Sequence, residues 1–528
     1  MSFVSLEFLV FALVLVAMYF VVPRKHQWKI LLIANFVFYA MSGVRMMLYI
    51  IFTIITTFLI ALRVENVNKD NKARLGQAGL SLEEKQAIKA ESVARKKLLC
   101  GIAMVANFGI WAFLKYANFF IENINQLLEA LHLPYECEAL KLILPLGISF
   151  YTFQAMGYLI DIYRGKYAAE KNIFRFALFL SYFPHIVQGP FSKFDELSET
   201  LFAEHKFSYD RLCGGCSRIL WGIFKKLIIA DKIGIVVNEI FKNPSGYGGI
   251  YIFMVIIFYG IQIYADFSGY MDIVCGISHI LGIRLAENFR QPYFARSVDE
   301  FWRRWHMTLG RWFRDYLFYP ISMGKFAQKL GKKARQKFGA RHGKLIPSYF
   351  ALIFVWTVTG LWHGANWTFF IWGMLNFITI MVSMHLEEGY AVVKGKLHIQ
   401  NDNLVWKGFQ IVRTFLLVCM FRFFSRAEDV QTALLMYKNM ILEWEFAELL
   451  QPLNLFVGMT LQDILIFAVA VVAMFAVDIF NERGQWEVLK QKTPMLIRNV
   501  IYVALIYALI LFAGGNNDLI GGFMYAQF

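Results

Sequence analysis

Apolar stretches that are long enough, or nearly long enough, to cross a lipid bilayer recur along the whole chain. A transmembrane helix needs about 20 mostly apolar residues, and only helices and closed barrels satisfy their own backbone hydrogen bonds in hydrocarbon. The stretches lie at residues 3–22, 30–42, 46–62, 98–118, 139–160, 219–241, 250–265, 345–362, 365–384, 404–421, 455–477 and 496–513. Several are short or interrupted by Gly and Pro, which is typical of broken or re-entrant helices around a buried cavity. The sequence therefore predicts an all-α, polytopic transmembrane helical bundle forming a single domain over residues 1–528.

The composition agrees with this prediction. Apolar residues make up 58% of the chain and charged residues 17%, whereas soluble domains carry roughly 25% charged residues. So few charges cannot cover a water-facing surface, which excludes a disordered chain, a disulfide-rich secreted scaffold and a conventional soluble enzyme. The net charge of +15 matches the positive bias of cytoplasmic loops, because the basic residues lie between apolar stretches. We therefore expect a lipid bilayer, and no nucleic acid, as the partner.

The charges of three segments orient the predicted bundle. Residues 63–97 and 321–347 are rich in Lys and Arg, and residues 119–138 contain Glu but neither Lys nor Arg. Because positively charged loops stay in the cytoplasm, we expect the two basic loops to be cytoplasmic and residues 119–138 to be external. The 63–97 insertion is predicted to be either a short amphipathic helical hairpin or a flexible segment.

One histidine lies inside a charge-free stretch. Residues 345–384 contain no Asp, Glu, Lys or Arg, and His363 lies there between Gly360 and Gly364. A polar ring at membrane depth is costly unless it faces a cavity or a partner, and a histidine can accept and return a proton near neutral pH. The alternative is a buried turn in which His363 is hydrogen-bonded to a neighbour such as Asn366. The sequence favours a functional histidine.

Residues 297–320 are predicted to contain one amphipathic helix. Ser297 and Glu300 have the spacing of a capping box at its start. On a 3.6-residue repeat, one face is cationic and the other is aromatic, with Trp305 on the aromatic face and His306 at its edge. The cationic face consists of Arg303, Arg304, Arg311 and Arg314. Such a helix either anchors the chain at a membrane interface or lines a groove for an anionic ligand, and periodicity alone favours the anchor.

A Pro- and Gly-punctuated strip at residues 183–191 includes Gln188 and Pro190. Irregular backbone at membrane depth must be buried in protein or face a cavity. His185, beside Pro184, is predicted to be structural.

Two carboxylates, Asp266 and Asp272, lie in an otherwise apolar segment at residues 264–272. An ion pair with the arginines of residues 303–314 explains them at least as well as catalysis does.

Several common catalytic and metal-binding motifs are missing from the sequence. It has no Gly-x-Ser-x-Gly elbow, no phosphate-binding loop and no His-Glu-x-x-His pair. Cys213 and Cys216 are closely spaced, but no second pair completes a zinc site. We therefore expect no metal.

Four motifs in this order resemble those of the membrane-bound O-acyltransferase family. They are Phe-Pro-x(4)-Gly-Pro (183–190), Tyr-x-Asp-Phe-Ser-Gly-Tyr-x-Asp (264–272), Phe-Trp-Arg-Arg-Trp-His-x-Thr-Leu-x-x-Trp-x-Arg-Asp-Tyr (301–316) and Trp-His-Gly (362–364). The chain is most similar to the bacterial branch of alginate O-acetylation and teichoic acid D-alanine-transfer membrane proteins. The resemblance covers nearly the whole chain and includes its ending, residues 523–528, but the 63–97 insertion matches no motif.

The resemblance implies a helical fold with a tunnel through the membrane and two site histidines. The family's invariant histidine corresponds to His363 and its second motif histidine to His306. We expect substrate or tunnel contacts from Trp305, Trp362, Asn366, Arg311, Arg314, Asp315, Asp266, Gln188 and Pro190. The implied co-substrate is an acyl thioester, either acetyl-CoA or an acyl carrier protein, offered from the cytoplasm, with no tightly bound cofactor.

The implied function is an O-acyltransferase of a bacterial cell membrane. It transfers an acyl group, acetyl by preference, to a surface polysaccharide or to an extracytoplasmic esterase-like relay protein. In this mechanism His363 is the general base on the acceptor hydroxyl, and His306 positions or polarises the thioester. The alternatives are D-alanyl transfer to teichoic acid, acylation of a lipid, and a glycan or lipid transporter without covalent chemistry.

Overall fold

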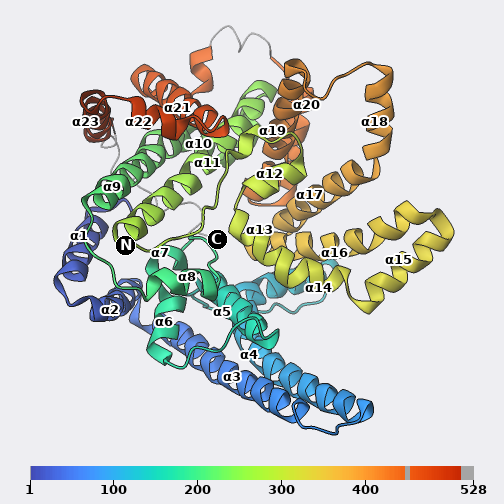
Figure 1. Cartoon of the computed structure of the whole chain (residues 1–528). Helices are drawn as coiled ribbons and strands as arrows, with labels where there is room; N and C mark the ends of the chain where they lie inside the picture. The colour runs from blue at the N-terminus through green and yellow to red at the C-terminus, as the bar shows by residue number, and fades with distance from the viewer. Residues whose placement is uncertain (1, 446–451, 513–528) are drawn as a thin grey trace. The chain divides into compact units, whose positions relative to one another are not determined.

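The computed structural model describes residues 2–445 and 452–512. Within them the regular elements are helices, and the one exception recorded is an isolated antiparallel bridge between Phe289 and Trp305 (Figure 1). The sequence ending at residues 523–528, which contributed to the family resemblance, lies outside the described residues. The described chain divides into two compact units, one of residues up to 216 with 274–286 and the other of residues 217–273 with 287 onward. The predicted single domain stays a prediction.

Eight helices in the described part of the chain are long and apolar enough to cross a membrane. They are α3 (Met47–Leu75), α4 (Leu82–Ala130), α11 (Gly249–Ile280), α16 (Ala340–His363), α17 (Trp367–His385), α19 (Leu404–Arg426), α21 (Leu461–Glu482) and α23 (Met495–Phe512). The prediction of an all-α polytopic bundle is confirmed. The expected membrane tunnel stays a prediction.

The first unit contains α3 and α4 together with shorter helices. These are α1 (Leu6–Val21), α2 (Gln27–Ala40), α5 (Ile148–Tyr163), α6 (Ile173–Ser181), α7 (Phe183–Ile186), α8 (Phe194–Leu201) and the beginning of α9 (Tyr209–Phe224). The long helices α3 and α4 form a hairpin whose far end carries the 63–97 insertion. Ser81 and Glu84 make a complete capping box at the start of α4, and Arg74 pairs with Glu91 at 2.8 Å across the hairpin. The helical-hairpin interpretation of the insertion is therefore correct.

Two predicted boundaries in this unit are wrong. Residues 119–130 belong to α4 rather than to a loop, because residues 110–130 contain no Pro or Gly that would end the helix. The apolar stretch 139–160 becomes helical only at Ile148, after Gly147 takes a left-handed conformation with φ of 69°. A Cβ atom at Gly147 would lie 2.0 Å from the carbonyl oxygen of Ile186, so only glycine fits this turn.

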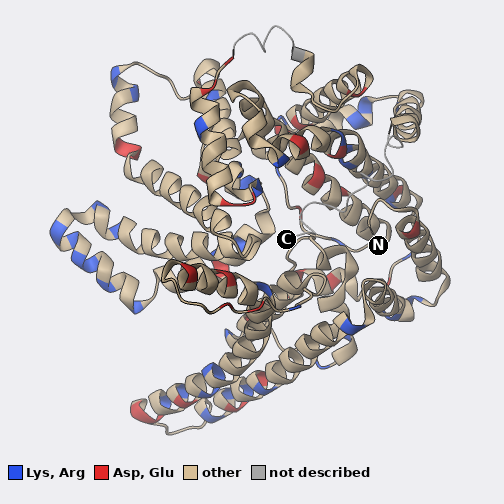
Figure 2. Ribbon diagram, turned by 180° about the vertical axis from the view of Figure 1, so that it is seen from behind, with Lys and Arg blue, Asp and Glu red and all other residues tan. Residues whose placement is uncertain are grey.

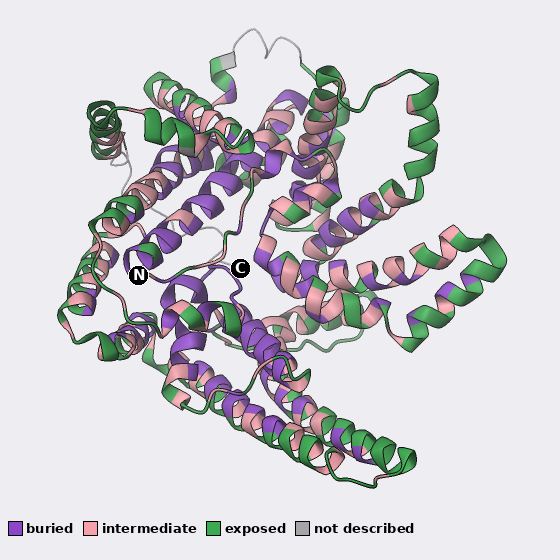
Figure 3. Cartoon of the chain, viewed as in Figure 1, coloured by how far each residue is buried: buried purple, intermediate pink, exposed green. Residues whose placement is uncertain are grey.

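The second unit is organised around α11, which Figure 3 shows as largely buried. Besides α11, its long helices are α16, α17, α19, α21 and α23. Its shorter helices are α10 (Asp231–Lys242), α12 (Val298–Arg304), α13 (Met307–Phe313), α14 (Tyr319–Ser322), α15 (Lys325–Phe338), α18 (Glu387–Lys396), α20 (Val430–Leu442) and α22 (Trp486–Lys492). A π-helical turn at Lys225–Ala230 separates α9 from α10, so the apolar stretch 219–241 is not one regular helix.

This π-helical turn brings two lysines against α11. Lys226 Nζ lies 2.8 Å from Asp266 Oδ1, and Lys225 Nζ lies 2.6 Å from Asp272 Oδ2. Arg218 of α9 also pairs with Asp272, at 2.9 Å. The two aspartates thus form ion pairs, which confirms the structural interpretation of them. Their partners, however, are basic residues at 218–226 and not the predicted arginines at 303–314.

The basic segment 321–347 is also helical. It contains the whole of α15 and the start of α16, and Figure 2 shows Lys and Arg residues along the ribbon of α15. Gly331 and Pro347 hold the two helices close, since a Cβ atom at Gly331 would lie 2.7 Å from the Pro347 ring. The cytoplasmic assignment of 63–97 and 321–347 stays a prediction.

Candidate active site

The segment that carries His306 is two short helices rather than one. Helix α12 ends at Arg304 and α13 begins at Met307, because His306 has a left-handed backbone with φ of 46°. A bulky residue in this conformation is strained by about 1–3 kcal/mol and persists only where its surroundings hold it. The predicted continuous amphipathic helix is therefore wrong, and Arg303 and Arg304 lie on a different helix from Arg311.

The start of α12 follows the prediction in part. The Ser297 hydroxyl accepts a hydrogen bond from the Glu300 amide, as an N-cap should. The Glu300 carboxylate, however, accepts from the Arg296 amide rather than from Ser297, so the capping box is incomplete.

Asn288, in the irregular segment after α11, holds the break at His306. Its backbone oxygen accepts from the Met307 amide. Its side-chain Oδ1 accepts from the Thr308 amide at 3.1 Å and from the Thr308 hydroxyl at 2.9 Å, and it lies 3.2 Å from His306 Nδ1. Because Asn288 Oδ1 accepts from the Thr308 amide, it is an oxygen and must also be the acceptor toward His306. Nδ1 of His306 therefore carries the proton. Asn288 therefore fixes the tautomer in which Nε2 of His306 is the basic nitrogen.

Burial keeps the His306 ring neutral. The side chain is almost fully buried, and removal from water lowers the pKa of His306 to about 3 because it penalises the charged imidazolium. At physiological pH the ring is thus a neutral imidazole.

Replacing Asn288 is expected to affect the reaction through His306. We expect Asn288→Ala to lower turnover about 10²-fold, the scale of effect that follows from a misplaced catalytic group. Asn288→Asp would put a carboxylate beside Nδ1 and raise the pKa of His306 from about 3. The ring would then gain a proton as the pH falls from 8 to 5, and activity would fall with it, whereas the unmodified protein has no such step from His306. Rate profiles between pH 5 and 8 measure this, and an unchanged profile in a folded Asn288→Asp protein would contradict the positioning role.

The second histidine ends a helix. His363 is the last residue of α16, and the chain turns through Gly364 before α17 begins at Trp367. The turn is tight, because a Cβ atom at Gly364 would lie 2.2 Å from the Phe369 ring and one at Gly360 would lie 2.5 Å from the Phe369 carbonyl oxygen. The two glycines thus let α17 return closely past His363.

Asn366 caps α17 rather than contacting His363. Its Oδ1 accepts from the Thr368 amide at 2.9 Å, and its Nδ2 donates to the Glu428 carbonyl at 2.9 Å. Asn366 is therefore not the hydrogen-bond partner of His363 that the alternative interpretation suggested, since its side chain caps α17 and binds the Glu428 carbonyl.

The two histidines share an aromatic neighbour. The Trp362 ring lies 6.2 Å from the His306 ring and 4.9 Å from the His363 ring, measured between centroids. Phe267 of α11 packs edge-on against the other side of His306 at 4.9 Å, and Trp372 of α17 packs against His363 at 5.1 Å. The second unit thus brings together His306, His363 and the predicted Trp362 in one buried cluster.

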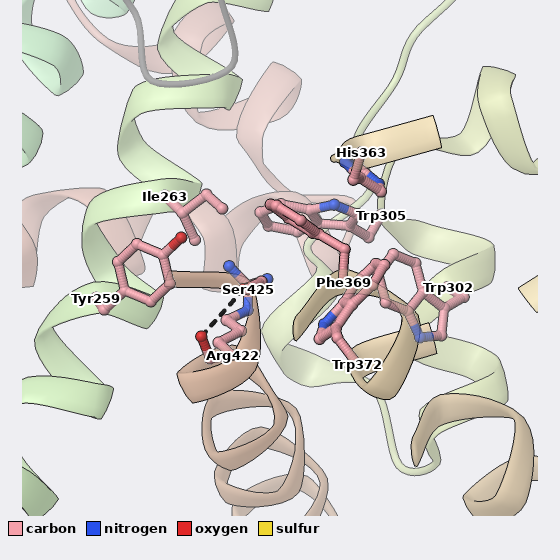
Figure 4. A pocket seen from close by; sticks show the side chains of 9 residues that line it. All are labelled: Tyr259, Ile263, Trp302, Trp305, His363, Phe369, Trp372, Arg422 and Ser425. Atoms are coloured by element: carbon pink, nitrogen blue, oxygen red, sulfur yellow. Dashed lines mark hydrogen bonds between the residues drawn. The ribbon is translucent and has the colours of Figure 1, made fainter. Parts of the chain in front are cut away.

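A pocket opens beside this cluster. It is lined by Tyr259, Ile263, Trp302, Trp305, His363, Phe369, Trp372, Arg422 and Ser425. Figure 4 shows these side chains coming from α11, α12, α16, α17 and α19 or from the turns beside them, with Trp305 drawn between His363 and Arg422. Aromatic rings make up most of the wall, and His363 and Arg422 supply its strongest polar groups. This is the composition of a ligand site, which is mostly apolar with a few placed polar groups.

The sequence missed most of the pocket's wall. Trp302, whose Nε1 donates to Asn376 Oδ1 at 2.9 Å, falls among the aromatic residues of the predicted amphipathic helix, and that pattern does not distinguish a pocket residue from a membrane anchor. Phe369 and Trp372 lie in a long apolar stretch, where nothing in the sequence distinguishes a pocket residue from its apolar neighbours. Arg422 follows the apolar stretch 404–421 directly, and a cation inside a helix otherwise long enough to span a bilayer was the available signal.

The remaining predicted residues of the second unit lie away from the pocket wall. Arg314 is 55% exposed, and its recorded ion pair is with the adjacent Asp315 at 3.2 Å. Arg311 is half-buried on α13, and Asp266 is paired with Lys226 as described above. Their roles in binding substrate stay predictions.

Gln188 and Pro190 belong to the first unit and are fully buried there. The strip that contains them begins with the short helix α7 and is otherwise irregular. The prediction that this strip is buried in protein is correct, but residues 183–186 are helical rather than irregular, and contact of the strip with substrate stays a prediction.

The described residues contain no group of three or more His, Cys, Asp or Glu side chains placed to hold a metal ion. The expectation of a reaction without metal stays a prediction.

Comparison with known proteins gives a consistent result. The sequence profile of the membrane-bound O-acyltransferase family matches residues 169–425, a range that contains His306, His363 and the whole pocket. The chain is 32% identical to the probable alginate O-acetylase AlgI of Pseudomonas aeruginosa, over 85% of this chain and 77% of that protein. It is 28% identical to the peptidoglycan O-acetyltransferase of Helicobacter pylori, over 78% of this chain and 73% of that protein. It is also 28% identical to the teichoic acid D-alanyltransferase of Streptococcus thermophilus, over 45% of this chain and 56% of that protein.

Proposed function

Because the chain belongs to the membrane-bound O-acyltransferase family, we propose that this multi-pass membrane O-acyltransferase passes an acetyl group from a thioester to a cell-surface polysaccharide. The similarity to two O-acetyl-transferring relatives spans most of the chain, whereas the similarity to the D-alanyltransferase spans less than half of it. This difference favours acetyl over D-alanyl as the transferred group. The acceptor is either the polysaccharide itself or an extracytoplasmic esterase-like protein that relays the group to it.

The observation that carries the proposal is the position of His363 on the wall of an aromatic pocket beside His306. In the proposed step, His363 takes the proton from the acceptor hydroxyl, and the hydroxyl oxygen bonds to the thioester carbonyl carbon. The carbon–sulfur bond then breaks, and the leaving thiolate receives the proton from His363. His306 is neutral and its Nδ1 proton faces Asn288, so its Nε2 atom can only accept a hydrogen bond. It therefore positions the thioester donor by accepting from an N–H or O–H group of that molecule, and it does not polarise the carbonyl oxygen.

The donor in this proposal is acetyl-CoA or an acetylated acyl carrier protein, used as a co-substrate and not as a tightly bound cofactor. We place the enzyme in the inner or plasma membrane of a bacterium, with the donor arriving from the cytoplasm. The basic helix α15 and the basic α3–α4 hairpin support a cytoplasmic donor, because positive charge is typical of cytoplasmic segments and attracts polyanions.

Arg314 gives a test of donor guidance by basic residues. It is exposed, and its recorded partner is a sequence neighbour, so it can meet an anionic donor at the surface. We expect Arg314→Gln to raise the apparent KM for the donor about 2- to 5-fold with kcat unchanged, because exposed charge pairs are worth up to about 1 kcal/mol. Arg303→Gln, which removes an equally exposed arginine paired with Asp299 on α12, is the control. A fall in kcat without a change in KM would contradict donor guidance.

Mass spectrometry of surface polymers, from cells with and without the gene, tests the proposed function. We expect acetyl esters to disappear from one polysaccharide when the gene is deleted and to return with the unmodified gene. Loss of D-alanyl esters with unchanged acetyl content would establish the D-alanyl alternative instead. Loss of a whole polysaccharide from the surface, rather than of its ester groups alone, would establish a transporter.

A further inference from the structure

Arg422 on α19 is a buried cation that forms no ion pair with the acidic side chains that the structure describes. Its side chain is 4% exposed. Among the described residues it makes no ion pair, and its Nη1 atom has no hydrogen-bond partner. A buried charge without a partner is costly, and an ionisable residue in a helix apolar enough to span a membrane marks a functional site by default.

The other buried cations of the second unit differ in this respect. Lys225 and Lys226 each lie within 2.8 Å of a carboxylate oxygen. Arg426, one turn further along α19, is only half-buried and donates to the neutral Asn238 Oδ1 at 2.8 Å. Arg422 therefore differs from the other buried cations of this unit, which have carboxylate partners.

Stacking on tryptophan satisfies only the faces of the Arg422 guanidinium. Its central carbon lies 4.6 Å from the centre of the Trp305 ring, which is cation–π distance. The N–H groups of a guanidinium point outward in its own plane, so a stacked ring leaves them to another acceptor. The planar fork matches the two oxygens of a carboxylate or phosphate.

Arg422 also lines the pocket that contains His363 (Figure 4). We infer that Arg422 holds an anionic group of a substrate, a carboxylate or a phosphate, in this pocket. The identity of that molecule as an acyl donor or acceptor rests on the proposed function. The phosphate of a pantetheine-bearing donor and the carboxylate of an acidic sugar acceptor are the two sources of such a group.

Equilibrium binding to the purified full-length protein tests this inference. The measurements use His363→Ala protein in detergent, so that binding does not depend on acyl transfer and a failure of the proposed function leaves the result readable. The probes are two matched pairs, phosphopantetheine with pantetheine and glucuronate with glucose. We expect one anionic probe to bind more tightly than its neutral twin, and Arg422→Gln to weaken it about 10- to 100-fold, the range for a charge-assisted hydrogen bond. The probe that loses affinity identifies the source.

Two further variants make the result decisive. Arg426→Gln, the control on the same helix, should leave the affinity within twofold. Arg422→Lys keeps the charge but loses the fork, so it should weaken binding less than Arg422→Gln, and it serves alone if Arg422→Gln does not fold. The inference is overturned if no anionic probe binds better than its neutral twin, or if a folded Arg422 variant keeps full affinity.

Discussion

His363→Ala is expected to lower acyl transfer about 10²–10⁴-fold, the range for loss of a general base, while the protein still folds and inserts. The residue ends α16 and faces an aromatic pocket, so its truncation removes the ring that accepts the hydroxyl proton without interrupting a helix. Transfer is measured with purified protein and an isotope-labelled acetyl thioester, at matched protein concentration.

His385→Ala is the matched control for this prediction. His385 ends α17 as His363 ends α16, but it is exposed and does not line the pocket. It should keep full activity. Turnover of His363→Ala at the unmodified rate, with normal protein yield, would rule out the assigned role.

Lys226→Met is expected to lower the free energy of unfolding by about 3–5 kcal/mol, the cost of breaking a buried ion pair. Lys226 is 2% exposed and lies 2.7 Å from Asp231 Oδ1 and 2.8 Å from Asp266 Oδ1. Its removal leaves the deeply buried Asp266 carboxylate without this counter-charge. Denaturation in detergent measures the loss.

Two comparisons separate this effect from simple loss of a lysine. Lys232→Met breaks the more exposed pair with Asp463 and should cost about 1 kcal/mol or less. Adding Asp266→Leu to Lys226→Met should recover much of the stability, because replacing both members of a buried pair by apolar residues is often nearly neutral. If Lys226→Met is no less stable than Lys232→Met, the pair does not stabilise the core.

The sequence predicts the spanning helices well, because the hydrocarbon of a bilayer selects long apolar stretches. It also isolates His363, since a polar ring stands out in a charge-free stretch. The length of an apolar stretch does not show where its helix begins. In the stretch 139–160 the left-handed Gly147 delays the start of the helix until Ile148.

The break at His306 was not predictable from the local pattern. A helical periodicity assumes a continuous helix, and the arginine and aromatic positions fit one. What holds the interruption is Asn288, which lies 18 residues before His306 and pairs with the His306 ring and with Met307 and Thr308 just after it. Such tertiary hydrogen bonds leave no mark in the local sequence.

Ion-pair partners were beyond the sequence for a similar reason. Arginines at residues 303–314 were as plausible partners for Asp266 as Lys226 was, and the π-helical turn at Lys225–Ala230 decides the choice. Arg422 shows the converse, because the lack of a partner is visible only once its neighbours are known.

Transfer across a membrane is the central claim, and proteoliposomes test it most directly. Labelled acetyl-CoA is supplied on one side of the vesicle and an acceptor polysaccharide, with any relay protein it requires, on the other. The account predicts labelled acceptor only when the donor faces the side of α15 and the α3–α4 hairpin, and loss of the label in His363→Ala. Labelling only when donor and acceptor share one side, or equal labelling by His363→Ala, would contradict it.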